Sequence, residues 1–259
     1  MNIIRFFKNR FYKHFLTLGE ISLLFYDTLK CSVSKPFYWH RLNEQIIALG
    51  VGSLSITIVI GFIMGLVMTL QFGYGLAKFG GTLYVPAIVS LSLMRELAPI
   101  FTSLLIAGRI GSGMSAEIGA MSVTQQIDAI RALGTSPTRV LVVPRFLASC
   151  ISLPLLSILA GFMGILGGLI IANFEFHMAP GFYINKVLST IKLHDVFSGF
   201  IKCFFFATVI TIFACYKGFK TKDGTRGVGE ATTWVVVQSS IIILISDFFL
   251  SKILILIFD

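Results

Sequence analysis

Charged residues are scarce in this sequence. Asp, Glu, Lys and Arg together make up 13% of its 259 residues, whereas hydrophobic residues make up 56%, and the mean hydropathy is +0.88. A soluble domain cannot bury that much apolar surface. The composition therefore excludes an ordinary soluble enzyme and predicts an all-α integral membrane protein, with a single domain over residues 1–259.

The groupings of residues that carry enzyme chemistry are also missing. The four cysteines are scattered without a CxxC pair, and the four histidines lie far apart, so we expect no metal site. No Ser/His/Asp or Cys/His arrangement predicts a catalytic residue. The GxxxxGK[ST] phosphate loop is absent, although Gly224, Gly227 and Gly229 form a glycine-rich stretch. We expect that the chain is not an enzyme and holds no cofactor, and that a partner ATPase binds any ATP and Mg.

Positive charge exceeds negative charge, with a formal net charge of +9. In a soluble protein this excess would suggest nucleic acid, but here the positive-inside rule explains it, and we expect no nucleic-acid partner. Seven Lys and Arg residues precede the first predicted span, three follow the second and four follow the fourth, against four on the opposite side. This distribution places the N-terminus in the cytoplasm and the C-terminus in the periplasm. No cleaved signal peptide is expected.

Five apolar stretches are long enough to cross a bilayer, which requires about 20 residues. They cover residues 46–72, 83–119, 140–173, 196–216 and 234–258. The region 1–45 precedes them, and within it residues 3–18 predict an amphipathic helix that lies in the membrane interface. In the first span, Gly61 and Gly65 form a GxxxG motif that permits close helix contact.

A short amphipathic helix is predicted at residues 122–133, between the second and third spans. Ser122 and Gln125 have the spacing of a capping box, and Gly134 is a stop signal. The helix would be about 16 Å long, too short to span the membrane. Its apolar face comprises Val123, Ile127 and Ile130. In the predicted orientation it faces the cytoplasm, where an ATPase can reach it; an ordinary capped loop helix is the alternative.

Four charged residues fall inside the outer halves of predicted spans, and they are Arg95, Glu96, Lys202 and Asp247. Each is costly against lipid, so we expect them to face protein or a wet cavity. Two cations and two anions sum to zero and could surround a cavity that binds the headgroup of an amphipathic substrate. Alternatively they are structural ion pairs that fix helix register. Arg109 and Glu117 lie deeper, and we expect them to support the surface helix.

The stretch RELAPIFTSLLIAGRIGSGMSAEIGAMSVTQQIDAI resembles the signature region of the MlaE (YrbE) family of ABC-transporter permeases. The later GTRGVGEATTWVVV is similar to that family's GVGxAT segment, and the resemblance covers most of the chain. The family's EQIDAL is QQIDAI here, which removes one acidic group at Gln125 and places Ile130 where the family has Leu. The resemblance implies that an ATPase couples through Thr124, Gln125, Gln126, Ile127, Asp128, Ala129 and Ile130.

The resemblance also implies an assembly. Two copies of the chain would form a homodimer in a bacterial inner membrane, with two cytoplasmic ABC ATPases and a periplasmic MCE-domain protein, and the cargo would be phospholipid. An ion-coupled secondary carrier is one alternative, which should show an inverted repeat that we do not detect. A non-transporting membrane scaffold is the other, and it predicts that the four buried charges can be neutralised without loss of lipid movement.

Overall fold

The computed structural model describes residues 2–33 and 38–258, with side-chain detail from residue 15 onward. The described residues are almost entirely helical and contain no strand, so the all-α prediction is confirmed. Five helical segments are long and apolar enough to cross a membrane, and each contains one of the predicted stretches. They are Trp39–Ala77, Thr82–Val123, Thr138–Phe174, Leu193–Phe219 and Gly224–Phe258.

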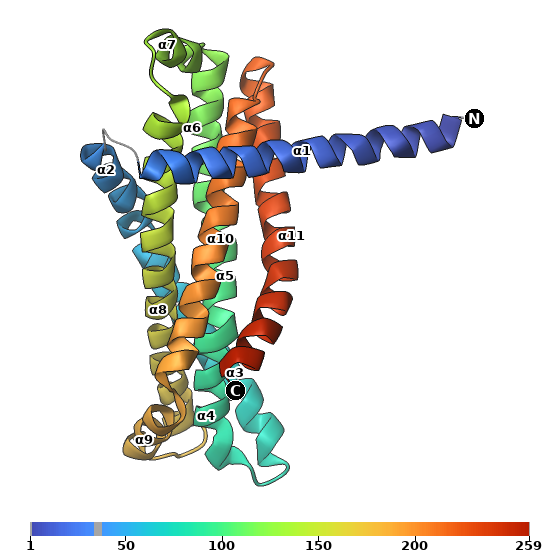
Figure 1. Cartoon of the computed structure of the whole chain (residues 1–259). Coiled ribbons are helices and arrows are strands. Elements are labelled where there is room, and N and C mark those ends of the chain that lie inside the picture. The colour runs from blue at the N-terminus through green and yellow to red at the C-terminus, as the bar shows by residue number, and fades with distance from the viewer. Residues whose placement is uncertain (1, 34–37, 259) are drawn as a thin grey trace.

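The first helix, α1 (Asn2–Ser32), lies across the bundle rather than along it (Figure 1). It contacts α8 (Val143–Phe174) and α10 (Leu193–Phe219) near the end that carries α7 (Gln126–Ala132). The helix extends well beyond the predicted amphipathic stretch 3–18. Most side chains of that stretch lie outside the described residues, so its position in the membrane interface stays a prediction.

One polar contact ties α1 to the end of α10. Glu20 on α1 accepts hydrogen bonds from Lys220 and, at 2.7 Å, from the hydroxyl of Tyr216. These bonds favour the ionised carboxylate, with that from Lys220 the larger cause, and they hold the pKa of Glu20 below its ordinary value of 4.5. The contact therefore contributes its full stabilisation above that value and loses it as the pH falls through the lowered folded-state pKa.

We expect α1 to separate from α10 in acid. With Cys31 replaced by Ser, nitroxide labels at exposed positions 23 and 222 should give one narrow distance distribution at pH 7. That distribution should broaden when the pH falls through the lowered pKa of Glu20, because the carboxyl group then becomes neutral. Glu20→Gln should show the broad distribution at both pH values. A narrow distribution for Glu20→Gln at neutral pH would show that apolar packing alone holds α1.

The first two spans consist of several helical pieces. α2 (Trp39–Leu49) and the short turn η1 (Val51–Ser53) lead into α3 (Leu54–Ala77). The second span contains η2 (Thr82–Tyr84), α4 (Val85–Ser92), η3 (Leu93–Leu97), α5 (Ala98–Ile106), η4 (Ala107–Gly111) and α6 (Ser112–Val123). Both η3 and η4 are π-helical turns. Pro99, which lacks an amide hydrogen, is the second residue of α5, so the irregular turn η3 lies just before the point where the regular hydrogen-bond ladder is interrupted.

The predicted close contact of the first span is confirmed against α8. A Cβ atom added at Gly61 would lie 2.5 Å from the carbonyl oxygen of Ala160, and one added at Gly65 would overlap the carbonyl oxygen of Gly164. Only glycine permits two helix backbones to approach this closely. This contact joins the first and third spans into one unit.

Gly65→Ala should destabilise the protein by about 1–3 kcal/mol or more, because the added methyl group forces α3 and α8 apart. Gly75→Ala is the matched control on the same helix, since its Cβ would meet nothing within 4 Å. That control should be neutral or slightly stabilising, because alanine favours the helix over glycine. Thermal unfolding of both variants in detergent measures the difference, and equal midpoints would contradict the packing argument.

The remaining helices complete the bundle around α10. α9 (Pro180–Thr190) precedes α10, which is largely buried, and α11 (Gly224–Phe258) lies at the edge of the bundle (Figure 1). The third span begins with a π-helical turn, η5 (Thr138–Val142). The core is continuous along α10, which contacts α5, α6, α8 and α11.

The predicted surface helix exists, but its start was wrong. Ser122 belongs to α6 and donates its hydroxyl to the carbonyl oxygens of Phe219 and Thr221 at 3.3 and 3.2 Å. Gln125 has a φ of 58°, in the left-handed region, and joins α6 to α7. A capping box requires Ser122 and Gln125 to lie at the start of the same helix. Because the left-handed Gln125 separates α6 from α7, Ser122 cannot cap α7, which begins at Gln126. Gly134, with a φ of 71°, ends it as predicted.

Candidate functional site

The predicted site residues form two groups toward opposite ends of the bundle (Figure 1). One group surrounds Lys202 near the end of the bundle that carries α4 and the C-terminus. The other lies on α7. The second span and α10 run between the two groups, so both are attached to the same continuous helices.

Lys202 on α10 is the centre of the first group, and its side chain is fully buried. Its Nζ atom pairs with Glu96 of η3 and, at 3.2 Å, with Asp247 of α11. It also donates to the carbonyl oxygen of Arg95 at 3.1 Å and to the hydroxyl of Ser251 at 2.7 Å. The structure thus brings three of the four predicted charges together from three separate spans. An unpaired buried ammonium group would be costly, and this arrangement satisfies it.

Arg95 points to a partner that the sequence analysis missed. Its guanidinium group pairs with Asp195, which is almost completely buried, and lies 3.3 Å from the ring of His194. Asp195 also accepts the backbone N–H of Lys192 at 2.7 Å, at the start of α10. The fourth span was predicted to begin at residue 196, so Asp195 was read as part of a loop. An acidic residue just before an apolar run is the signal of a helix N-terminus that could have identified it.

Asp195 changes the charge balance of this group, which we call the Lys202 cluster: Arg95, Glu96, Asp195, Lys202 and Asp247. The four predicted charges sum to zero, and Asp195 adds a third carboxylate to the two cations. Both cations are engaged by carboxylates. Glu96 and Arg95 keep the largest exposed side-chain fractions, 35% and 22%. A ligand that approaches from the adjoining hollow therefore meets these two side chains first.

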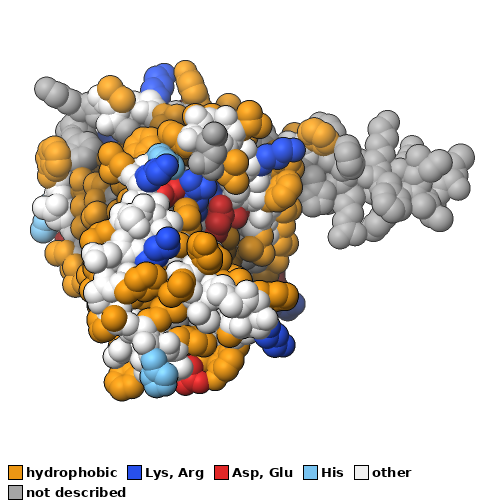
Figure 2. All heavy atoms as spheres, turned by 90° about the horizontal axis from the view of Figure 1, so that it is seen from below, with side chains coloured by type: hydrophobic (Ala, Val, Ile, Leu, Met, Phe, Trp, Pro, Cys, Tyr) orange, Lys and Arg blue, Asp and Glu red, His pale blue; other side chains and the backbone are white. Residues whose placement is uncertain are grey.

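The hollow beside the cluster opens at this end of the molecule. It is lined by Arg95, Glu96, His194, Ser198, Ser251 and Phe258, among others. The ring of His194 is stacked on that of Phe258, with centroids 6.1 Å apart. Figure 2 views this end and shows basic, acidic and histidine side chains grouped within a mainly hydrophobic surface. The volume of the hollow is only about 10 Å³, room for about one water molecule, so the helices must move apart before an amphipathic ligand can enter between the charges and the apolar wall.

The three π-helical turns within residues 2–33 and 38–258 each contain one arginine, namely Arg95, Arg109 and Arg139. A π-helical turn inserts one extra residue into an α-helix and is frequent at functional sites. In η3 the consequence is visible: the adjacent residues Arg95 and Glu96 reach Asp195 and Lys202 at the same time.

Arg109 and Glu117 lie between the two groups and connect spans. Arg109 donates to the carbonyl oxygen of Gly52 and, at 2.8 Å, to the hydroxyl of Ser53. Glu117 pairs at 2.7 Å with the buried Arg145 of α8. These contacts join the second span to the first and the third. Any support that Arg109 and Glu117 give to α7 is therefore indirect, through the spans to which α7 is attached.

The α7 group divides into an anchor and an exposed surface. Ile127 is 4% exposed and belongs to a core cluster with residues of α6, η5 and α10. Asp128 is exposed and pairs with the exposed Arg131 at 3.1 Å. The other predicted coupling residues are exposed except for the half-buried Ile130, and they are Thr124, Gln125, Gln126 and Ala129. Leu133 is 82% exposed at the end of α7, and the sequence analysis did not single it out.

Five spans, an ion cluster buried near one end and an anchored surface helix at the other define a membrane transport protein. The comparison with known families agrees: the family described as Permease MlaE matches residues 42–253. The chain therefore belongs to the MlaE permease family, as the sequence resemblance suggested.

Its relatives carry permease names. A probable ABC transporter permease protein of Rickettsia typhi is 34% identical over 92% of each chain. Another, from Synechocystis, is 42% identical over 80% of this chain and 79% of its own. The intermembrane phospholipid transport system permease protein MlaE of Haemophilus influenzae is 35% identical over 93% of this chain and 92% of its own. This chain is thus a multi-pass permease of the ABC transporter class.

Proposed function

We propose that this chain moves phospholipid between the bacterial inner membrane and a periplasmic carrier, driven by a partner ATPase. The observation that carries the proposal is the Lys202 cluster, an ion group set among apolar spans beside a small hollow at one end of the bundle. The name of the Haemophilus influenzae relative supports phospholipid as the cargo. In this proposal the cluster faces the periplasm and α7 faces the cytoplasm.

The assembly we propose is a homodimer with two ABC ATPases, which bind ATP and Mg, and a periplasmic MCE-domain protein. α11 and the first span are the least buried spans, with 17% and 22% of their most apolar stretch buried against 56% in α10, and a second copy packed on α11 would cover part of this exposed surface. Lipid would then occupy a cavity between the two copies, reached through the hollow beside Glu96 and Arg95.

Coupling between the two ends follows from shared helices. The anchor of α7, Ile127, packs in the same core cluster as Ile212 of α10, and Ile212 lies on the same helix as Lys202, about 15 Å away. A displacement of α7 by the ATPase is therefore passed to α10 and to the cluster. Because Arg95 is paired with Asp195, a lipid phosphate must compete with that carboxylate for the guanidinium group. A shift of α10 would change the distance between Arg95 and Asp195 and so determine whether the phosphate is bound.

Reconstitution tests the proposal directly. The chain is placed in liposomes with an ABC ATPase and an MCE-domain protein from the same organism, and transfer of labelled phospholipid to an acceptor is measured with and without ATP. We expect transfer that requires both ATP and the ATPase. Equal transfer by the chain alone would favour the secondary carrier, and an assembled complex without any transfer would favour the scaffold.

A further inference from the structure

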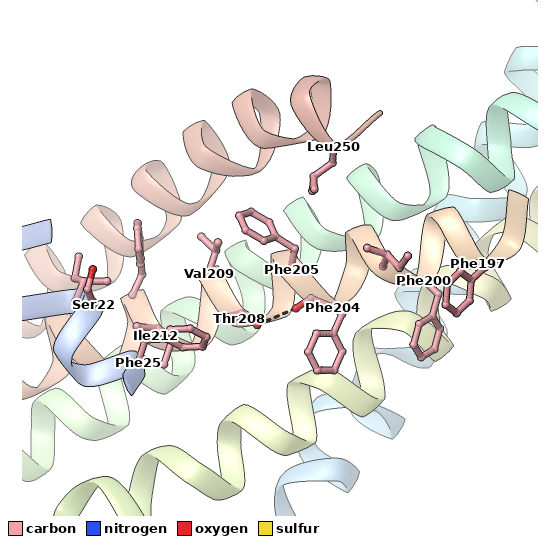
Figure 3. A pocket seen from close by; sticks show the side chains of 13 residues that line it. Ser22, Phe25, Phe197, Phe200, Phe204, Phe205, Thr208, Val209, Ile212 and Leu250 are labelled. Carbon is pink, nitrogen blue, oxygen red and sulfur yellow. Dashed lines mark hydrogen bonds between the residues drawn. The ribbon is translucent and has the colours of Figure 1, made fainter. Parts of the chain in front are cut away.

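A groove lies on the outer face of α10, apart from the Lys202 cluster and from the hollow beside it. It has a volume of about 780 Å³ and is bounded by α1 at one end and α11 along one side (Figure 3). Its walls include Phe200, Phe204, Phe205 and Val209 of α10, Phe25 of α1 and Leu250 of α11. Such a volume is in the range of pockets that hold small molecules, about 300–1,000 Å³.

The residues that line the groove offer a ligand no free hydrogen-bond donor. Its two hydroxyl groups already donate within their own helices, Ser22 to the carbonyl oxygen of Leu18 and Thr208 to that of Phe204, both at 2.9 Å. All other lining residues are hydrophobic. The occupant of this groove must therefore be apolar over the length that it buries.

The groove is also unlike the helix contacts of this protein. α3 and α8 meet through glycines whose Cβ atoms would collide with the opposite backbone. The residues that line the groove include neither glycine nor alanine and are mostly phenylalanine and isoleucine or valine. Helices associate closely in membranes where small residues line the contact. Bulky walls separated by a narrow space suit flexible hydrocarbon chains better than another helix.

Aromatic and basic side chains gather where the groove ends near α1. Phe213 of the groove contacts the ring of Trp234, with centroids 5.8 Å apart, and Lys217 lies 5.4 Å from the same ring. Lys220 and Tyr216 follow on α10 and bind Glu20 of α1. Tryptophan, tyrosine and lysine in this arrangement mark the level of the lipid headgroups. The two lysines outnumber the one carboxylate, which leaves a net positive charge there.

We propose that this groove binds an anionic phospholipid, with its acyl chains along α10 between α1 and α11 and its phosphate beside Lys217 and Lys220. The groove extends from Phe213 to Phe197, about 24 Å along the helix, which is enough for the chains of one leaflet, about 15 Å deep. A lysine ammonium group has three donors, so Lys220 can serve both Glu20 and a phosphate. The bound lipid stabilises α1 against the bundle, independently of the transported lipid.

Site-specific photocrosslinking tests this site in the full-length protein. A diazirine analogue of phenylalanine replaces Phe204 in the groove, or Phe162 on α8 as the control; the native side chains are 47% and 53% exposed. Each protein is placed in nanodiscs of phosphatidylcholine with a small fraction of labelled phosphatidylglycerol. We expect strong labelling from position 204 and little from position 162. Equal labelling from both positions would mean contact with bulk lipid only and would overturn the proposal.

Charge variants test the headgroup position. Lys217→Gln and Lys220→Gln should each reduce the crosslinking of phosphatidylglycerol at position 204 by about fivefold, the effect of one basic residue near an anionic lipid. Lys78→Gln is the control, because it removes an exposed lysine that lines no part of the groove; its crosslinking should not fall. Arginine at both lysine positions should restore the signal in a protein that has folded. Unchanged crosslinking in the glutamine variants, or crosslinking of position 204 to a polypeptide, would overturn the proposal.

Discussion

Lys202→Met should abolish lipid transport and destabilise the folded protein by about 3–5 kcal/mol, the typical cost of removing one partner from a buried ion pair. Lys202 is fully buried, and its loss leaves Glu96 and Asp247 facing one another without a cation. The measurements are thermal unfolding in detergent and ATP-dependent lipid transfer by the reconstituted complex. Lys252→Met, an exposed position on α11, is the control and should change stability by no more than about 0.5 kcal/mol.

A triple variant separates stability from function. Lys202→Met combined with Glu96→Gln and Asp247→Asn removes the cation together with both of its carboxylates, so no uncompensated charge remains at this point. We expect stability to return to within about 1 kcal/mol of the native protein. Transport should stay absent, because Glu96, which meets a ligand together with Arg95, has lost its charge, and the ionic links of η3 and α11 to α10 are gone. If transport returned together with stability, the cluster would serve only to fix helix register.

Asp128→Lys should reduce coupled transport by about tenfold, equivalent to roughly 1.4 kcal/mol of lost docking free energy between α7 and the ATPase. Asp128 is exposed, and its only recorded ion pair joins it to the exposed Arg131, so stability should change by no more than about 0.5 kcal/mol. ATP hydrolysis and lipid transfer are measured together in the reconstituted complex. We expect the amount of lipid moved per ATP to fall, while the unfolding temperature of the variant stays equal to that of the native protein.

Two further variants serve as controls for Asp128→Lys. Glu44→Lys reverses the charge of an exposed acidic residue in a different helical pair, with His40 on α2, and should leave transport unchanged. Ile127→Ala should reduce transport as well, but through a loss of stability of about 2–5 kcal/mol, because Ile127 is a buried anchor and not a docking residue. Full coupled transport in Asp128→Lys would exclude α7 as the contact through which the ATPase acts.

Most of the architecture could be predicted from hydrophobic patterning. The five spans, the GxxxG contact of Gly65 and the surface helix before Gly134 all depend on local sequence, since a bilayer requires long apolar helices whose backbone groups are satisfied within each segment. The boundaries were less accurate where the tertiary structure intervenes. Ser122 looks like a helix cap, but its hydroxyl is used by the end of α10, far away in the sequence.

The candidate site was predicted in part. A charged residue within an apolar run is conspicuous, so Arg95, Glu96, Lys202 and Asp247 were found without a structure. Asp195 was missed because it lies at the start of a helix, where an acidic residue is ordinary. The predicted coupling residues were treated as one set, and only burial divides them into the anchor Ile127 and an exposed surface.

The sequence by itself determined that this protein crosses a membrane five times, that four charges lie within its apolar stretches and to which family it belongs, because hydropathy, charge cost and motif are properties of short stretches. The tertiary structure alone decided which carboxylate each cation meets, that Asp195 tips the Lys202 cluster toward negative charge, and that a phenylalanine-lined groove lies between α1, α10 and α11. These features depend on side chains from distant segments, and their pairing is set by how the helices pack.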